Sequence, residues 1–363
     1  MPSGSQPLLC YRAGERALRR VREHGLGPAQ VRALIAPAAG PKWLAVAGLD
    51  RALITGGYLR GRAAPLLLLG ASAGAWRCVA LAARDPQAAH ERLAATYCAQ
   101  RFVRADRPAA ISAAYARLLE HVVDDADVAH ALAHPELDLA ILVARGRLGT
   151  ASNAFALQAA ALGLAAALNA ISADSGRLFF TRTLFASAHA ERAAHPLLGG
   201  LAAERVALSR ENLRGALLAS GTVPFYMAAV RELAGAAPGA YLDGGLTDYH
   251  VNQPLDLEGQ GVALLFLHQA RIVPNWFDKS LPWRAPSAQR LRDVLLVHPD
   301  PRWVASLPGG AVPTREDFQR FEREPELRIE RWLAAVKRSQ ELGEQLLHDV
   351  ASGEIAAKVS GFA

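Results

Sequence analysis

The chain has 363 residues, of which 51% are hydrophobic, and a formal net charge of +6. This length and composition indicate a globular protein with a large core, in one α/β domain with additions, and exclude a largely disordered chain. The basic residues are scattered rather than gathered in a stripe with aromatic residues, so we expect no nucleic-acid partner.

The sequence contains three cysteines, Cys10, Cys78 and Cys98, an odd number without the spacing of metal ligands. This usage indicates reduced thiols. The apolar residues near the N-terminus are interrupted by Tyr11 and Arg12, which is not the pattern of a signal peptide. We therefore expect a cytoplasmic protein.

The first predicted strand covers residues 31–36 (VRALIA). It leads into a tight loop of small residues at 37–42 (PAAGPK), and we expect a helix to begin at Trp43. Lys42 is one of only four lysines in the chain, and its place in this loop is a weak indication of function.

Residues 70–74 (GASAG) lie between a predicted buried strand at 65–69 (PLLLL) and a predicted helix at 76–83. A serine on a sharp strand-to-helix turn has a strained backbone, and small flanking residues relieve the crowding around it. Such a turn lifts the Oγ of Ser72 clear of the sheet at a helix N-terminus, where developing negative charge is stabilised. The pattern predicts a nucleophile elbow.

Residues 84–132 read as helical and predict a cap (about 84–135) beside the elbow helix. Within it, Asp127, His130 and His134 would share one face of a helix, which leaves a zinc site as an alternative. We expect instead that the aspartates form an acidic first helical turn and that the histidines are solvated, so we predict no metal site.

Residues 151–170 contain no charged side chain and approach the length of a membrane span. Alanine is only weakly apolar and three amide side chains interrupt the run, so we expect a buried or partly exposed helix. Its position between predicted strands at 137–144 and 177–186 favours a crossover helix in a layered sheet.

Residues 219–225 (ASGTVPF) close a further predicted helix, and residues 241–245 (YLDGG) follow. Taken alone, the Asp-Gly-Gly sequence is typical of a turn. Its position in the order of elements is what makes it informative: it follows a strand, a small-residue loop with a cation, a helix, a second strand and the serine elbow.

In this order the chain resembles the patatin-like phospholipases, which are lipid acyl hydrolases, over residues 31–254. The elbow and the Asp-Gly-Gly are the specific parts of the resemblance. It implies a three-layer α/β/α fold with a central, mostly parallel sheet. It also implies a catalytic dyad in which Ser72 is the nucleophile and Asp243 the base. The substrate would be a lipid or small ester, cleaved through an acyl-serine intermediate, and no cofactor would be needed.

In that family, backbone N–H groups of the first loop form the oxyanion hole. Gly40 and Lys42 fall on its pattern, but Ala38 and Ala39 stand where glycines are expected, and Pro41 has no N–H to donate. Removing one such donor costs about 3 kcal/mol of transition-state stabilisation. The resemblance implies an oxyanion hole of Ala39, Gly40, Ala73 and Lys42, with Gly70, Gly74, Gly244 and Gly245 as the glycines of the elbow and the turn.

An aspartate is a weak base, with an ordinary pKa of about 3.9. Asp243 can therefore accept the serine proton only if a dry pocket raises its pKa and the oxyanion hole carries much of the charge.

Two alternatives stay open. A Ser-Asp-His triad of the α/β-hydrolase type would use His250, His268 or His298, although we predict only one strand before the strand of the elbow, which argues against it. A catalytically weak lipid-binding protein with the same fold is the other alternative, and the altered first loop supports it.

The remaining chain extends this core. Residues 262–267 and 294–297 predict further strands. Residues 272–286, with Trp276 and Trp283, predict a loop that could line the pocket.

From residue 315 onward the chain is charged and helical and is expected to pack on the core, with a homodimer contact as an alternative. We divide the chain into a catalytic domain at 1–300 and a helical extension at 301–363. The positive charge would suit a peripheral contact with an anionic membrane, and residues 151–170 could form a lipid-facing lid.

Overall fold

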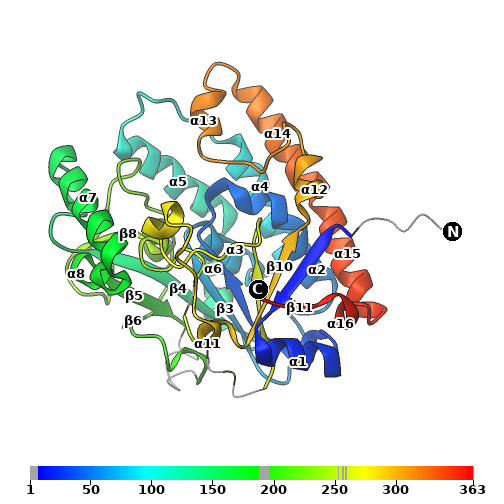
Figure 1. Cartoon of the computed structure of the whole chain (residues 1–363). Helices are drawn as coiled ribbons and strands as arrows, with labels where there is room; N and C mark the ends of the chain where they lie inside the picture. The colour runs from blue at the N-terminus through cyan, green and yellow to red at the C-terminus, as the bar shows by residue number, and fades with distance from the viewer. Residues whose placement is uncertain (1–6, 188–195, 252, 256, 258–259, 363) are drawn as a thin grey trace.

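A mixed sheet runs through the centre of the molecule between two covering layers (Figure 1). The computed structural model describes residues 7–187, 196–251, 253–255, 257 and 260–362. Within these residues the sheet has eleven strands in the order β11-β1-β10-β9-β2-β3-β4-β5-β6, with β8 beside β4 and β7 beside β8. Their bounds are β1 (Leu9–Ala13), β2 (Val31–Ala36), β3 (Leu66–Ala71), β4 (Leu137–Gly146), β5 (Phe180–Ala186), β6 (Glu204–Ala207), β7 (Val230–Arg231), β8 (Ala240–Asp243), β9 (Val262–Phe266), β10 (Val294–Pro299) and β11 (Ser360–Gly361).

The five central strands, β10, β9, β2, β3 and β4, are parallel to one another. Their side chains alternate between the two faces of the sheet, as the period of a strand requires. In β3, Leu66 and Leu68 belong to the core on one face, while Leu67 and Leu69 belong to the core on the other. A strand that is buried on both faces has a continuous run of apolar residues in its sequence. For this reason the apolar residues at 65–69 predicted β3.

A thick helical layer covers one face of the sheet, and a thinner layer of loops and short helices covers the other (Figure 1). The fold class predicted from the sequence, three-layer α/β/α, is confirmed. The helical layer contains α1 (Glu15–His24), α2 (Ala47–Thr55), α3 (Ala73–Leu81), α4 (Pro86–Ala99), α5 (Pro108–Val122), α6 (Asp125–Ala133), α10 (Leu213–Ser220), α12 (Pro301–Ala305), α14 (Pro325–Arg338), α15 (Gln340–Ala351) and α16 (Ile355–Lys358). The other helices are α7 (Phe155–Ile171), α8 (Gly176–Phe179), α11 (Ala288–Leu291) and α13 (Asp317–Arg320).

The edge of the sheet differs from the prediction. Two strands, not one, precede the strand of the elbow, because β1 pairs antiparallel with β10 and parallel with β11. The partners of β1 come from residues 294–299 and 360–361, so the short stretch at 9–13 gains its strand structure from the far end of the chain. The same pairing ties the predicted C-terminal extension into the sheet.

The prediction of a crossover helix at 151–170 is wrong. The helix exists as α7, but β4 and β5, the strands that it connects, are antiparallel neighbours. A crossover joins parallel strands, so this connection needs none. Across the described part of the chain, no helix combines the length and apolarity that crossing a membrane demands.

The predicted helical regions are divided more finely in the structure. The region at 84–132, predicted to be helical, contains three helices, α4, α5 and α6. The helix expected from Trp43 begins as a 3-10 turn over Gly40–Val46, and α2 itself begins at Ala47. The strand predicted at 177–186 begins only at Phe180, after α8.

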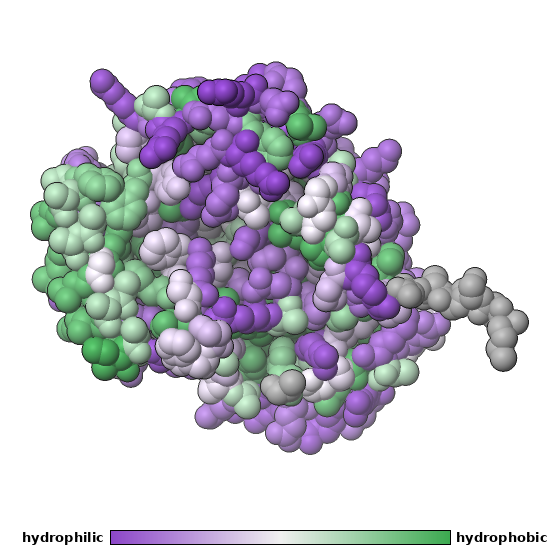
Figure 2. All heavy atoms as spheres, turned by 45° about the horizontal axis from the view of Figure 1, so that its top comes forward, coloured by the Kyte–Doolittle hydropathy of each residue, from purple (hydrophilic) through white to green (hydrophobic). Residues whose placement is uncertain are grey.

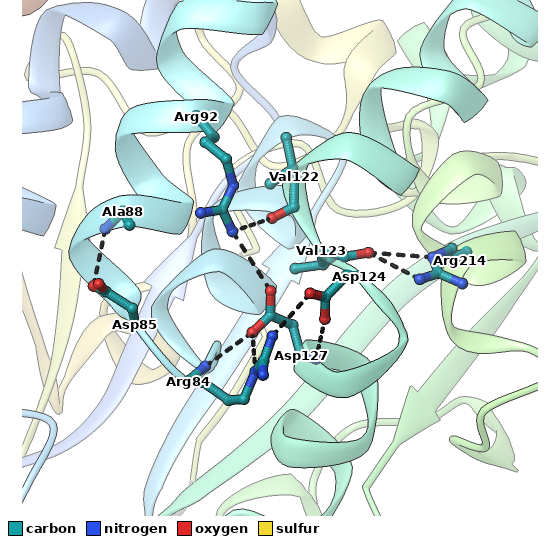
Figure 3. Close-up of polar contacts among 9 residues, drawn as sticks. All are labelled: Arg84, Asp85, Ala88, Arg92, Val122, Val123, Asp124, Asp127 and Arg214. Carbon is teal, nitrogen blue, oxygen red and sulfur yellow. Dashed lines mark hydrogen bonds and ion pairs between the residues drawn. The ribbon is translucent and has the colours of Figure 1, made fainter.

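Asp127, one of the three residues weighed as a zinc site, is engaged by arginines instead (Figure 3). Its side chain is buried and accepts hydrogen bonds from Arg84 Nε at 3.0 Å and Arg92 Nη2 at 3.5 Å. Asp124 caps α6 by accepting the backbone N–H of Asp127 at 2.7 Å, which is the acidic first turn that the sequence predicts. The His130 ring contacts the His134 ring edge-on.

A buried ion pair joins α2 to α3. Arg77 donates to the Asp50 carboxylate through Nε at 2.7 Å and Nη2 at 2.6 Å, and His90 Nε2 lies 3.0 Å from the same group. Burial alone would raise the pKa of Asp50, but the charge and hydrogen bonds of Arg77 outweigh it and lower that pKa to about 2. The pair fixes the two helices that follow the first loop and the elbow.

We expect Asp50→Ala to lower the free energy of unfolding by about 3–5 kcal/mol, because it leaves the Arg77 charge buried and unpaired. Urea denaturation measures the loss. The adjacent Arg51→Ala is the matched control, since it removes only an exposed pair with Glu91 at 3.6 Å and should cost less than about 1 kcal/mol. Equal losses in the two variants would contradict this account of the pair.

Candidate active site

Ser72 occupies a strained turn between β3 and α3. Its φ of 54° and ψ of −132° lie outside the regions that L-residues favour, at a cost on the order of 1–3 kcal/mol. Gly74 makes the turn feasible, because a Cβ on it would lie 1.9 Å from the carbonyl oxygen of Ala36 at the end of β2. Gly70 is equally confined, since its Cβ would lie 2.5 Å from the Cα of Ala75.

Strand β4 aligns Ser72 with Asp243. One edge of β4 is occupied by β5 from Ala140 to Gly146, so β3 and β8 share the other edge end to end. Ala71, the last residue of β3, pairs with Leu142, and Asp243, the last residue of β8, pairs with the next residue, Val143. The two strands approach each other head-on, and their ends bring the serine and the aspartate together.

The Ser72 hydroxyl donates a hydrogen bond directly to Oδ2 of Asp243 at 2.7 Å. The other carboxylate oxygen, Oδ1, accepts the backbone N–H of Gly245 at 2.7 Å, which fixes the orientation of the carboxylate. Burial raises the pKa of Asp243 above its ordinary value, although these hydrogen bonds and the charges of Arg315 and Lys279 act in the opposite direction. Asp243 is therefore a stronger base than a solvated aspartate.

The C-terminal end of α10 holds the backbone of both residues. The Ser220 hydroxyl accepts the backbone N–H of Ser72 at 2.8 Å and donates to the carbonyl of Leu142 at 2.6 Å. The backbone N–H of Asp243 donates to the carbonyl of Thr222 at 2.8 Å. These contacts explain why the stretch at 219–225 accompanies the elbow and the Asp-Gly-Gly in the sequence.

The first loop lies beside the serine, at the start of the 3-10 turn over Gly40–Val46. Ala39 is the N-cap of that turn with a φ of −124°, so its alanine side chain causes no strain. Gly40 follows with a φ of +53°, a conformation that favours glycine. Ala38 differs from both, because its N–H already donates to the carbonyl of Tyr249 at 2.9 Å. The first N–H groups of a helix lack acceptors within that helix, so Gly40 and Ala73 offer donors of the kind an oxyanion hole uses.

Two cavities meet at Ser72. The first contains about 1010 Å³ of empty space, including the part open to solvent, and its walls are largely aromatic and aliphatic. The helices α3, α4 and α5 and the segments around 223–227 and 315–319 form it. The side chains that give it this character are Trp76, Tyr97, Ile111, Tyr115, Met227 and Phe318.

The second cavity contains about 720 Å³ of empty space and is positively charged on balance, with Lys42, Lys279 and Arg315 facing Asp243 and Glu316. Lys279 Nζ also lies 4.3 Å from the centre of the Tyr249 ring. Burial and the charges of Arg315 and Lys42 lower the pKa of Lys279 to about 8. Burial is also the main cause that lowers the pKa of Lys42.

Lys279 and Arg315 are the site residues that the sequence reasoning missed. One weak signal was available: lysine is rare in this chain, and two of the four lysines, Lys42 and Lys279, line this cavity. The predicted loop at 272–286 contributes Trp276 to the cavity, whereas Trp283 is 70% exposed. Nothing in the local pattern around Arg315 distinguishes it from its many neighbouring arginines.

None of the three histidines weighed for a triad lines either cavity. His250 is fully buried, and its Nδ1 accepts the backbone N–H of Val273 at 2.8 Å. His268 is buried against His250, with ring centres 6.3 Å apart, and burial lowers its pKa to about 3. His298 lies on β10 with its Nδ1 2.9 Å from the carbonyl of Pro299.

One group of potential metal ligands occurs in the described part of the chain, formed by His348, Asp349 and Glu354. Lys358 Nζ lies 2.6 Å from Asp349 and 2.8 Å from Glu354, so an ammonium group already pairs with both carboxylates. The group is on the C-terminal helices and lines neither cavity at Ser72.

No protein-family model and no curated protein matches the chain. Among solved structures, the crystal structure of VipD from Legionella pneumophila matches with a TM-score of 0.31 and 11% sequence identity, over 73% of this chain and 55% of VipD. The match thus spans about half of the length of VipD.

We expect Ser220→Ala to lower the free energy of unfolding by about 1–3 kcal/mol, because it leaves the buried N–H of Ser72 and the carbonyl of Leu142 without this partner. Thr222→Val is the matched control. It removes a hydroxyl that donates only to the carbonyl of Leu218, one helical turn earlier, and should cost about 1 kcal/mol or less. Urea denaturation of both variants measures the difference, and a smaller loss for Ser220→Ala would contradict its bracing role.

Proposed function

We propose that this protein is a serine esterase of the patatin-like type that hydrolyses acyl esters of lipids. The observation that carries the proposal is the direct hydrogen bond of 2.7 Å between the Ser72 hydroxyl and the Asp243 carboxylate, on a strained elbow where two cavities meet. A hydroxyl bonded to a buried base and facing open space is the arrangement that nucleophilic catalysis requires.

In the first half of the reaction, Oγ of Ser72 attacks the ester carbonyl carbon while its proton passes to Asp243. The carbonyl oxygen becomes an oxyanion, which the N–H groups of Ala39, Gly40 and Ala73 stabilise, with the charge of Lys42 close by. The C–O bond to the alcohol then breaks, and the protonated Asp243 returns its proton to the leaving alkoxide. The product is an acyl-serine.

In the second half, Asp243 removes a proton from a water molecule, which attacks the acyl carbon through the same oxyanion site. The acid is released as Ser72 recovers its proton from Asp243. The raised pKa of Asp243 favours the proton transfers from Ser72 and from water. It reduces the difference in pKa between the carboxylate, which accepts the proton, and the hydroxyl group that gives it up.

The two cavities divide the substrate between them. The aromatic and aliphatic walls of the first suit an acyl chain, since apolar surface is buried there. The cations of the second, Lys42, Lys279 and Arg315, suit a negatively charged head on the alcohol side of the ester, such as a phosphate. A lipid ester with an anionic head group therefore fits the site best.

A dyad fits the site better than a triad. The Ser72 hydroxyl is bonded to the carboxylate without an imidazole between them, and His250, His268 and His298 lie outside the walls of both cavities. The alternative of a catalytically weak lipid-binding protein becomes the better account if the serine does not react.

We expect an alkyl phosphonate ester to add once to the native chain, as measured by intact mass, and Ser72→Ala to remove the adduct. Asp243→Asn should lower kcat for short nitrophenyl esters by about 100-fold or more, because the general base is lost. His268→Ala is the control and should leave kcat within about twofold. Labelling that persists in Ser72→Ala, or loss of activity in His268→Ala, would count against the dyad.

We also expect the pH dependence of the reaction to have an acidic limb and a basic limb, each caused by a different residue. Activity should fall as the pH drops through the raised pKa of Asp243, and Lys279→Met should move this limb to higher pH, because the Lys279 charge lowers that pKa. For an anionic ester, KM should rise above a pH of about 8 as Lys279 loses its proton, whereas KM for a neutral ester should not. Rate profiles with both esters test this, and an acid limb that stays in place in Lys279→Met would be inconsistent with it.

A further inference from the structure

Helix α7 turns its polar side chains towards the protein. Gln158 and Asn169 are buried, and both bond inward: Nε2 of Gln158 donates to the carbonyl of Thr150 at 3.0 Å, and Nδ2 of Asn169 donates to Oδ1 of Asp278 at 2.8 Å. A helix on the surface of a globular protein normally places such groups in water.

Several large apolar side chains of α7 face outward, although Leu162 and Ala165 pack into the core. Phe155, Leu164 and Ile171 are 72%, 54% and 83% exposed, and the whole helix contains no charged residue. Figure 2 shows the result as a broad green area on the left of the molecule, over the position of α7 and α8. Leu178 of α8 and Trp283, in the loop before α11, are also exposed. An exposed apolar area of this kind marks a site of contact with an apolar partner.

This surface continues to the mouth of the first cavity. The ring of Phe155, at the start of α7, lies 5.3 Å from the ring of Phe225, and the N–H of Phe225 donates to Oε1 of Gln158 at 3.3 Å. Phe225 and its neighbour Tyr226 line the same cavity as Ser72. An acyl chain that moves along the outward face of α7 would thus reach the cavity over apolar side chains, from Phe155 to Phe225.

Arginines stand at both ends of the helix. Arg231 donates to the carbonyl of Ala151, just before α7. Arg284 donates to the carbonyl of Asn169, near the end of α7, and its Nε also lies 3.5 Å from the buried Asp278. The nearby acidic residue Asp174 is already paired with Arg177 at 3.4 Å. An apolar area flanked by cations matches the interface of an anionic bilayer, where acyl chains lie beneath negative head groups.

A protein partner would need different chemistry. Alanine is depleted at protein interfaces and leucine is under-represented among their hot spots, whereas the outward residues of α7 are mainly alanine and leucine. Trp283 lies next to Arg284 at the end of the helix, where a membrane-bound protein would place an aromatic side chain at the level of the head groups.

We propose that the outward face of α7, with Leu178 and Trp283, docks the protein on an anionic lipid membrane and presents the first cavity to its acyl chains. The inference rests on the proposed function in that it takes the substrate to be a lipid ester. The helix lies on the membrane, with its buried face still bound to the protein.

The test is co-sedimentation with vesicles of equimolar phosphatidylcholine and phosphatidylglycerol. We expect the unaltered chain to bind, and Leu164→Gln/Ile171→Gln to reduce the partition coefficient about tenfold or more, since two exposed apolar side chains lose their lipid contact. Leu333→Gln, which changes a 43% exposed leucine on α14, is the matched control for Leu164→Gln and should bind as the unaltered chain does. Vesicles of phosphatidylcholine alone should bind more weakly, because they offer the arginines no negative charge.

Equal binding by the double variant and the unaltered chain would overturn the proposal, as would no binding by the unaltered chain. A dimer in light scattering that the double variant dissociates, without any vesicle binding, would assign the face to a second copy of the chain and overturn it too. Hydrolysis of a soluble nitrophenyl ester should be the same in every variant. Vesicle binding without such hydrolysis would reject the esterase function while supporting the docking surface.

Discussion

The register of β4 is the constraint on which the site depends. Two consecutive residues of that strand, Leu142 and Val143, pair with the last residues of β3 and β8, and this pairing sets the distance between the serine and the aspartate. A shift of one residue would turn the side chains of a strand to the other face of the sheet and separate the two groups. The carbonyl of Leu142 also accepts the Ser220 hydroxyl, so the same residue of β4 braces the elbow.

The electrostatics of the site follow from this geometry. Asp243 is buried where the two strands meet, and this burial raises its pKa, while the charges of Lys279 and Arg315, which line the same cavity, limit the rise. The carboxylate is thereby more basic than in water, which a serine nucleophile without a histidine requires. The buried Asp50 and Arg77 pair holds the helices that follow the loop and the elbow against each other.

Features written in a few neighbouring residues could be predicted from the sequence. The apolar run at 65–69 predicted β3, and the small residues around Ser72 predicted the sharp turn that its φ of 54° now describes. Features that depend on distant pairing could not be predicted. Strand β1 escaped notice because its partners lie near the other end of the chain, and α7 was misplaced as a crossover because the direction of β5 is set by its neighbours in the sheet. Lys279 and Arg315 belong to loops whose composition gives no sign of where they fold.

The placement of β1 also has a consequence for biosynthesis. Its main partner, β10, is translated some 280 residues later, and β11 later still. As the chain leaves the ribosome, β2, β3, β4 and β8 are all available before β9 and β10, so the centre of the sheet can assemble while its first segment still has no neighbour. An unpaired strand edge invites association with other chains, so residues 9–13 are open to such association until translation has supplied β10.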